Sequence, residues 1–116
     1  LLPLTDETRG ILNREALELV QLGGYLIKVA RGALLVEADL RNLLEDGRLA
    51  GATLDVFEDE PLPPDHWLWT QPFVNVTPHI SAQTVRRDAV VQVALGVRAL
   101  MRGVPPARVV KRSRGY

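Results

Sequence analysis

Apolar residues along this chain form short, uninterrupted runs that alternate with segments of helical spacing. We expect buried strands at residues 25–30, 52–57 and 73–77, since each run is short, apolar and bounded by glycine or proline. Residues 1–4 have the character of the end of a further strand. The proline-rich segment 58–71 is expected to be a structured loop. Strands that alternate with helices over short connections predict a parallel sheet, and therefore an α/β unit.

Three other segments have the spacing of a helix with one apolar side. The first is 14–20, where the preceding Asn13 is suited to accept hydrogen bonds as an N-cap. The second is 36–44, with apolar residues at i, i+4, i+7 and i+8. A long third helix is expected to start at Ser81 as its N-cap and to run to about Arg102.

Composition narrows the function classes. The chain is 47% hydrophobic, and 14 basic residues balance 14 acidic ones, so no overall field favours nucleic acid or an anionic membrane. The one basic run, at 108–114, is expected to be a solvated chain end. With no cysteine there is no disulfide or thiolate chemistry, which fits the cytoplasm. No apolar stretch approaches the ~20 residues that span a bilayer. Because the chain opens inside an apolar segment, we expect a fragment of a longer protein.

A cation, a carboxylate and an imidazole follow the three predicted strands in turn. Arg31 follows the first strand, Glu60 lies shortly after the second, and His79 follows the third. Ligands of an open parallel sheet bind outside the carboxyl ends of its strands, so these groups can meet over one small molecule. A guanidinium binds a carboxylate in two parallel hydrogen bonds, and an imidazole exchanges a proton near neutral pH. A carboxylate beside that imidazole fixes its tautomer.

Each candidate also has a purely structural interpretation. Arg31 is equally consistent with a surface arginine at a strand end, and a lone histidine such as His79 is structural more often than catalytic. Glu60 belongs to an acidic triplet, most of which are merely solvated. Asp55, inside the second apolar run, must find a donor, either a backbone amide or an amide of a ligand.

Several functional motifs are missing from the sequence. It contains no G-x-G-x-x-G or G-x-x-x-x-G-K-[ST] phosphate loop, no G-x-S-x-G elbow and no H-x-x-x-H spacing. The chain therefore lacks a phosphate cradle of its own, and no metal site is predicted.

Four short motifs follow one another in a distinctive order. They are LPLT at residues 2–5, LIKVARG at 26–32, DVFEDEP at 55–61 and TPHI at 77–80. Together they resemble the C-terminal part of the NAD(P)-binding domain of D-isomer-specific 2-hydroxyacid dehydrogenases, over essentially the whole chain. The tail at 112–116 further resembles the glyoxylate/hydroxypyruvate reductase A branch of that family.

The resemblance implies a role for each candidate. Arg31 corresponds to the arginine that binds the substrate carboxylate and carbonyl, His79 to the proton donor, and Glu60 to the glutamate that supports it. Asp55 corresponds to the aspartate that binds the nicotinamide carboxamide. Cofactor contacts are implied for ten residues in all: Leu2, Pro3, Thr5, Val29, Ala30, Arg31, Asp55, His79, Ser81 and Ala82.

The resemblance also implies an architecture and an activity. Residues 1–80 correspond to the C-terminal half of a Rossmann-type doubly wound parallel sheet, and 81–116 to a long helix and tail that return to a substrate domain outside the chain. The implied activity is hydride transfer between NAD or NADP, with NADPH favoured, and a small 2-oxoacid or D-2-hydroxyacid. The full-length enzyme is expected to be a homodimer, and the isolated chain is expected to be inactive.

Two rival interpretations and two departures accompany this resemblance. An NAD(H)-sensing, corepressor-like interaction protein shares the fold, and formate dehydrogenase relatives carry glutamine where Glu60 stands. Lys28 replaces an asparagine that is common in the family and is expected to alter a hydrogen bond beneath the turn. Trp67 stands where a proline is usual. Neither departure touches a catalytic position.

Overall fold

The structure is a computed structural model that describes residues 1–107, 109–110 and 113. The chain divides into two compact units, Leu1–Ser81 and Ala82–Tyr116, which are considered separately. Most of the basic run and of the tail motif predicted near the C-terminus lies outside the described residues.

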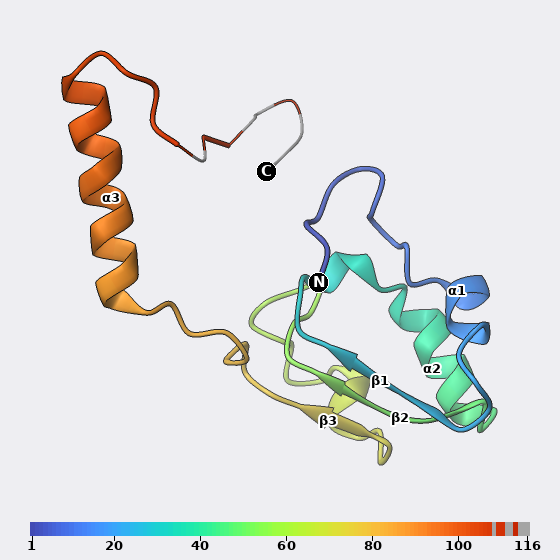
Figure 1. Cartoon of the computed structure of the whole chain (residues 1–116). Coiled ribbons are helices and arrows are strands. Elements are labelled where there is room, and N and C mark those ends of the chain that lie inside the picture. The colour runs from blue at the N-terminus through green and yellow to red at the C-terminus, as the bar shows by residue number, and fades with distance from the viewer. Residues whose placement is uncertain (108, 111–112, 114–116) are drawn as a thin grey trace. The chain divides into compact units, whose positions relative to one another are not determined.

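Three parallel strands form one sheet in the first unit (Figure 1). They are β1 (Gly24–Lys28), β2 (Leu49–Leu54) and β3 (Val74–Val76), and they lie side by side in that order. All three strands run in the same direction, so their carboxyl ends share one edge of the sheet. This arrangement confirms the predicted parallel sheet and α/β class.

Two helices and two single 3₁₀ turns complete the first unit. The helices are α1 (Arg14–Glu18) and α2 (Glu37–Glu45), and the turns are η1 (Gly32–Leu34) and η2 (Trp67–Trp69). Asn13 caps α1 as predicted, because its side-chain oxygen accepts from the Ala16 N–H at 3.0 Å.

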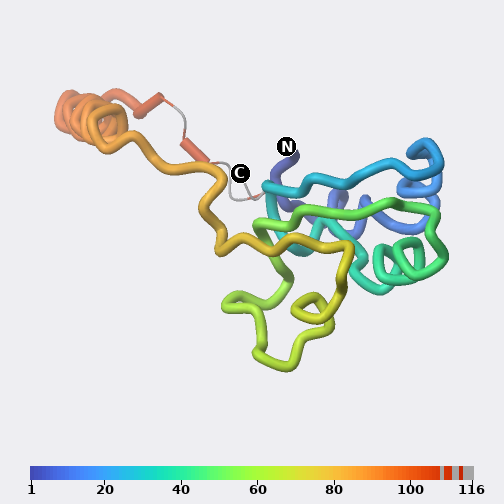
Figure 2. Tube along the Cα trace, turned by 90° about the horizontal axis from the view of Figure 1, so that it is seen from below, coloured from blue at the N-terminus to red at the C-terminus, as the bar shows by residue number. Residues whose placement is uncertain are grey.

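The core of this unit lies between α2 and the sheet. Figures 1 and 2 show α2 running beside the strands with α1 next to it. Leucine dominates the buried cluster, whose most fully buried large side chains are Leu17, Leu40, Leu43, Leu44, Leu49, Leu54 and Leu68. The apolar side of the predicted helix at 36–44 is thus the side that packs on β2.

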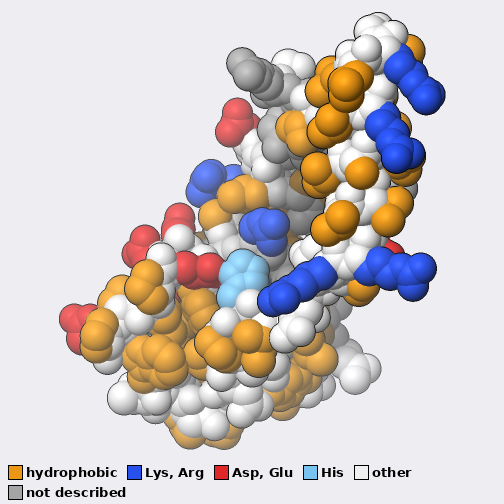
Figure 3. Space-filling view, turned by 90° about the vertical axis from the view of Figure 1, so that its left-hand side faces the viewer, with side chains coloured by type: hydrophobic (Ala, Val, Ile, Leu, Met, Phe, Trp, Pro, Cys, Tyr) orange, Lys and Arg blue, Asp and Glu red, His pale blue; other side chains and the backbone are white. Residues whose placement is uncertain are grey.

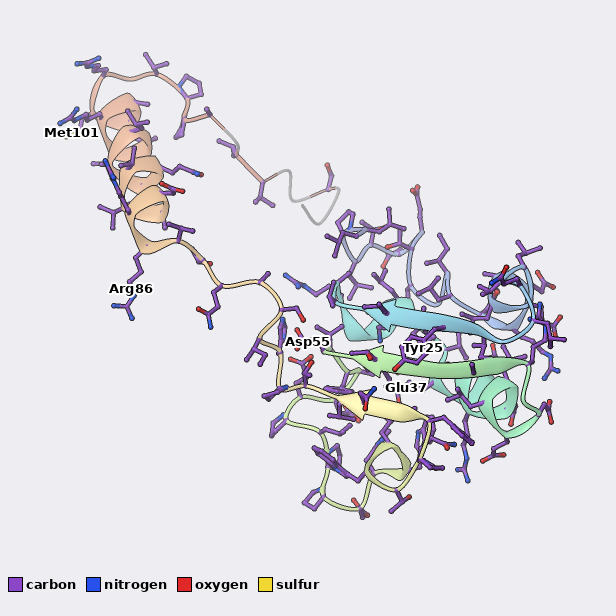
Figure 4. The ribbon with its side chains drawn as sticks, turned by 60° about the horizontal axis from the view of Figure 1, so that its bottom comes forward. Tyr25, Glu37, Asp55, Arg86 and Met101 are labelled. Atoms are coloured by element: carbon purple, nitrogen blue, oxygen red, sulfur yellow. The ribbon has the colours of Figure 1, made fainter. Side chains whose placement is uncertain are left out.

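The opposite side of the sheet is exposed and partly polar. Tyr25 and Ile27 of β1 are about half and two-thirds exposed. The Tyr25 hydroxyl shares a hydrogen bond of 3.0 Å with the Thr53 hydroxyl of β2 and accepts from the Asn75 amide of β3 at 2.9 Å. Figure 4 shows Tyr25 lying on the sheet. One chain of hydrogen bonds therefore crosses all three strands.

All three predicted strands have other bounds in the structure, and β3 is one residue shorter at each end than the predicted 73–77. β1 stops at Lys28 rather than at residue 30, and β2 covers Leu49–Leu54 rather than 52–57. The last backbone bond between them runs from the Asp55 N–H to the Lys28 carbonyl, at 3.0 Å. Val56 and Phe57, which follow Asp55, stay buried although they lie outside the paired strand. Burial therefore extends beyond the residues that pair with a neighbouring strand.

Two further predictions were wrong. Residues 1–4 form no strand; instead the Thr8 hydroxyl donates to the Pro3 carbonyl at 2.7 Å and holds this segment as a loop. Ser81 is not an N-cap, because residues 82–85 are not helical and Val85 occupies the N-cap position of the helix that follows. The long helix, α3 (Arg86–Met101), starts five residues later.

The second unit contains α3 and no buried residue within that helix. Figure 3 shows hydrophobic side chains along its length, with basic side chains beside them, and Figure 4 marks its two ends. The exposed apolar residues are Val90, Val91, Val93, Leu95, Val97, Leu100 and Met101. Among the described residues, no helix has the length and apolar character needed to cross a membrane.

Candidate active site

Asp55 organises the carboxyl edge of the sheet. It follows β2 directly and is buried at that edge (Figure 4). Its Oδ1 accepts from the Thr77 hydroxyl at 2.5 Å and from the Ile80 N–H at 2.9 Å, and its Oδ2 accepts from the Ser81 N–H at 2.9 Å. Burial raises the pKa of this carboxyl, but the hydrogen bonds outweigh it and hold the pKa well below its usual range. Asp55 therefore ties the segment after β3 to the end of β2.

His79 sits within the segment that Asp55 holds. Its φ is +53°, a left-handed conformation that is uncommon for residues other than glycine. The chain is fixed on both sides of His79. Before it, the Thr77 N–H donates to the Leu54 carbonyl at 3.0 Å, and after it the Ile80 and Ser81 N–H groups donate to Asp55. Such a conformation costs about 1–3 kcal/mol and persists only where the surroundings impose it.

Glu60 binds His79 from the segment after β2. The His79 Nδ1 lies 2.8 Å from Glu60 Oε2, and the Phe57 N–H donates to Glu60 Oε1 at 2.9 Å. The Phe57 amide, the imidazole and the nearby Arg31 guanidinium together hold the pKa of Glu60 below its usual value. An ionised Glu60 accepts from Nδ1–H, which leaves Nε2 as the ring nitrogen able to exchange a proton. Both side chains remain partly exposed, with 48% of the His79 side chain and 37% of the Glu60 side chain accessible.

Arg31 lies on a turn that is pressed against the segment after β2. A Cβ added to Gly32 would lie 1.7 Å from the Phe57 carbonyl oxygen, so only glycine fits. The Arg31 side chain is exposed and donates from Nη1 to the Ala30 carbonyl at 2.7 Å. Beneath the turn, the buried Lys28 Nζ donates to the Gly32 carbonyl at 2.6 Å. The turn that contains Arg31 is thus in direct backbone contact with Phe57 and Glu58, in the segment that leads to Glu60.

A largely apolar pocket of about 460 Å³ adjoins the Glu60–His79 pair. Leu62, Trp69 and Val76 supply apolar walls, and Glu60 and His79 supply polar ones. The pocket places apolar surface beside an acid–imidazole pair, a combination typical of small-molecule sites.

The residues expected to contact a cofactor lie mostly around the same edge. Val29 and Ala30 follow β1, and Ser81 is held by Asp55. The segment with Leu2 and Pro3 lies beside the carboxyl end of β1 in both ribbon and tube views (Figures 1 and 2). Thr5 is tied into that segment by Thr8, whose hydroxyl accepts from the Thr5 N–H at 2.8 Å. Ala82, the last of the expected contacts, belongs to the second unit.

The Asp55 carboxylate is fully engaged by the chain. A carboxylate offers about four acceptor positions, and they are taken by the Thr77 hydroxyl, the Ile80 and Ser81 N–H groups and the Ser81 hydroxyl. An amide N–H of a nicotinamide carboxamide would therefore replace one of these donors. Within the described part of the chain, no group of histidine and acidic residues is arranged to hold a metal ion.

Comparison with known proteins identifies the family. Residues 1–81 match the family model described as "D-isomer specific 2-hydroxyacid dehydrogenase, NAD binding domain". The chain belongs to this dehydrogenase family. The match confirms the resemblance inferred from the four motifs.

Individual relatives agree with the family assignment. Over all 116 residues the chain is 52% identical to glyoxylate/hydroxypyruvate reductase A of Serratia proteamaculans, and it spans 37% of that protein. It superposes with a TM-score of 0.92 and 44% identity on a D-isomer specific 2-hydroxyacid dehydrogenase from Xanthobacter autotrophicus, solved with NADPH and MES. An NADPH-dependent glyoxylate/hydroxypyruvate reductase from Sinorhizobium meliloti, solved with NADP and sulfate, gives 0.89 and 40%. The alignments cover the whole chain and 48% and 38% of those two dehydrogenases.

Thr77 was not among the predicted site residues, and Lys28 was named only as a departure expected to alter a hydrogen bond beneath the turn. Thr77 holds Asp55 through its hydroxyl, and Lys28 supports the Arg31 turn. Thr77 follows from the pairing of the parallel strands: Leu54 pairs with Val76, so the next residue of each strand, Asp55 and Thr77, lie side by side. For Lys28, the signals are a charged residue inside an otherwise apolar run and the departure from the asparagine that is common in the family.

Proposed function

We propose that the full-length protein containing this chain reduces a small 2-oxoacid, of the glyoxylate or hydroxypyruvate type, to the D-2-hydroxyacid. The observation that carries this proposal is the 2.8 Å contact between His79 Nδ1 and Glu60 Oε2 at the carboxyl edge of the sheet. The names of the relatives support the substrate class.

In this reaction the chain orients the substrate and supplies a proton. Arg31 binds the substrate carboxylate through its guanidinium and polarises the neighbouring carbonyl. Glu60 accepts from Nδ1–H of His79 and so keeps the imidazolium oriented. As the carbonyl carbon gains hydride, His79 Nε2–H donates its proton to the carbonyl oxygen, which becomes the product hydroxyl. Afterwards the imidazole is neutral and Glu60 remains ionised.

A nicotinamide cofactor supplies the hydride when bound. NADPH is favoured over NADH, because the relatives from Xanthobacter and Sinorhizobium carry NADPH or NADP. In this proposal Asp55 accepts from the carboxamide, while the Val29–Ala30 backbone, Ser81 and the segment with Leu2, Pro3 and Thr5 line the cofactor.

The proposal also covers organisation and location. Residues 1–80 would complete a dinucleotide-binding domain with the preceding part of the full-length protein, and 81–116 would return to its substrate domain. We propose a homodimer, which the family resemblance implies, and a location in the cytoplasm, in agreement with the absence of cysteine.

The test is His79→Ala in the full-length enzyme, assayed by NADPH oxidation with a panel of 2-oxoacids. We expect kcat to fall by about 10²–10⁴-fold, the usual contribution of a positioned acid, while cofactor binding persists. His66→Ala is the matched control, since His66 is the other histidine of the chain. It lies outside the Glu60–His79 pair, and its Nε2 is 3.3 Å from Oε2 of Glu37, at the start of α2.

Turnover close to wild type in His79→Ala would contradict the assigned role. A wild-type protein that binds NAD(P)H but oxidises it with no 2-oxoacid would instead favour the interaction-protein alternative.

A further inference from the structure

Lys28 is a charged side chain in the interior of the first unit. It is the last residue of β1 and is 3% exposed. Its Nζ donates to the Gly32 carbonyl at 2.6 Å and lies 3.4 Å from the Val56 carbonyl, its second acceptor. One acceptor belongs to the turn that carries Arg31, and the other to the segment that leads to Glu60.

A buried ammonium is costly unless hydrogen bonds replace its water. An apolar residue would fill the same space without that cost, so packing alone does not account for Lys28. What the ammonium adds is a hydrogen-bonded connection between two backbone segments that follow different strands. The segments also touch directly, since Gly32 packs against the Phe57 carbonyl.

The connection continues to the proposed proton donor. The Phe57 N–H binds Glu60 Oε1, and Glu60 Oε2 lies 2.8 Å from His79 Nδ1. Lys28 therefore stands between the substrate-binding turn and the acid–imidazole pair, although it touches neither Arg31 nor His79 through its amine.

We propose that Lys28 is a positioning residue for 2-oxoacid reduction, holding the Arg31 turn at a fixed distance from Glu60 and His79 by binding the Gly32 and Val56 carbonyls. This inference rests on the proposed function. It assigns to Lys28 a part in substrate binding, because displacement of the turn moves the guanidinium away from the position where the carboxylate must lie.

The charge on Lys28 changes within an accessible pH range. Burial lowers its pKa to about 8, against the opposing effect of three carboxylates. Glu37 faces it from the start of α2, and Glu58 and Glu60 face it from the segment after β2. Above this pH the neutral amine forms weaker hydrogen bonds to the two carbonyls, since charge-assisted bonds are about twice as strong. The KM for the 2-oxoacid is therefore expected to rise as pH increases through about 8.

The test compares two variants of the full-length enzyme by steady-state kinetics with glyoxylate. Lys28→Met keeps the length of the side chain and removes the donor; we expect KM to rise by about 10- to 100-fold, as for a substrate misplaced by about 1 Å, with a smaller fall in kcat. Lys28→Gln keeps a neutral donor, so we expect partial recovery of KM at neutral pH and no rise in KM near pH 8.

Tyr25→Phe is the matched control. It removes hydrogen bonds from the same strand, on the exposed side of the sheet, and should leave both KM and its pH dependence unchanged. A second measurement follows the two lysines of the 116-residue chain, Lys28 and Lys111, by NMR with labelled lysine. One resonance should titrate near 8, and Lys28→Gln should remove that resonance.

The outcomes separate the two proposals. An active wild type whose KM and pH profile are unchanged in Lys28→Gln overturns the role of Lys28 alone. A wild type that reduces no 2-oxoacid overturns the proposed function, and the role of Lys28 with it. If Lys28→Met fails to fold, the comparison of Lys28→Gln with wild type, in KM and in its pH dependence, decides the matter.

Discussion

Replacing Gly32 by alanine should separate the Arg31 turn from the segment after β2. The added Cβ would lie 1.7 Å from the Phe57 carbonyl oxygen and 2.4 Å from the Glu58 nitrogen. Both neighbours are backbone atoms, so they cannot rotate away as a flexible side chain could. Since Cβ atoms essentially never approach other atoms closer than 3.0 Å, the turn must move by at least 1.3 Å, the difference between 3.0 and 1.7 Å.

The cost can be worked out from this displacement. Overpacking of a filled interior costs about 1–3 kcal/mol. A shift of 1.3 Å also stretches the 2.6 Å bond from Lys28 to about 3.9 Å if the carbonyl moves away from Nζ, beyond hydrogen-bond range. Losing a hydrogen bond from a charged donor adds about 1.5–3 kcal/mol. We therefore expect Gly32→Ala to lower the free energy of unfolding of the first unit by at least about 2 kcal/mol.

Urea unfolding of the 116-residue chain, followed by tryptophan fluorescence, measures this loss. Both tryptophans, Trp67 and Trp69, lie in the first unit, so the signal reports on that unit. Gly96→Ala is the control, since it makes the same chemical change within α3, where the nearest side-chain atom is 4.0 Å from the new Cβ. A Gly32→Ala chain that unfolds at the wild-type urea concentration would refute the reasoning, because the close approach would then carry no energetic consequence.

Two further predictions concern the stability of the same unit. The pKa values of Asp55 and Glu60 are lowered on folding, so the folded state binds fewer protons than the unfolded state near their ordinary values of 3.8 and 4.5. The free energy of unfolding should therefore fall as pH decreases through this range, and it should fall less in Asp55→Asn. Urea unfolding at several pH values measures both effects. Asn13→Ala removes the cap on α1 and should cost about 1 kcal/mol by the same assay, whereas an unchanged midpoint would show that the 3.0 Å bond to the Ala16 N–H is not needed.

Local pattern was sufficient to predict most elements of the fold. The leucines of α2 recur at helical spacing because one side of the helix packs on β2, and Asn13 has the side chain that an N-cap needs. Strand ends were not predictable in this way. Val56 and Phe57 are as buried as strand residues, but the ladder has already stopped, and an apolar pattern reports burial rather than pairing.

The start of α3 and the linkages of the site depend on contacts between distant residues. Ser81 has the right side chain for an N-cap, yet its N–H and that of Ile80 are bound to Asp55, and the helix begins only after Val85. Arg31, Glu60 and His79 could be selected because each follows a predicted strand, and parallel strands bring their carboxyl ends together. The bond from the Phe57 N–H to Glu60 could not be predicted, since it depends on how the loops pack after the strands have ended. For Lys28 a changed hydrogen bond beneath the turn was predicted, but its two acceptors were not.

The hydrogen bonds joining Tyr25, Thr53 and Asn75 bear on how the strands find the correct alignment during folding. A slip of β2 by one residue would place Ala52 or Leu54 where Thr53 stands, leaving the tyrosine hydroxyl without this partner and turning the core face of the strand outward. Misaligned pairing is thus penalised on both sides of the sheet, by lost polar contacts on one and by lost burial on the other. The hydrogen bonds on the exposed side of the sheet would therefore favour the correct strand pairing over a shifted one.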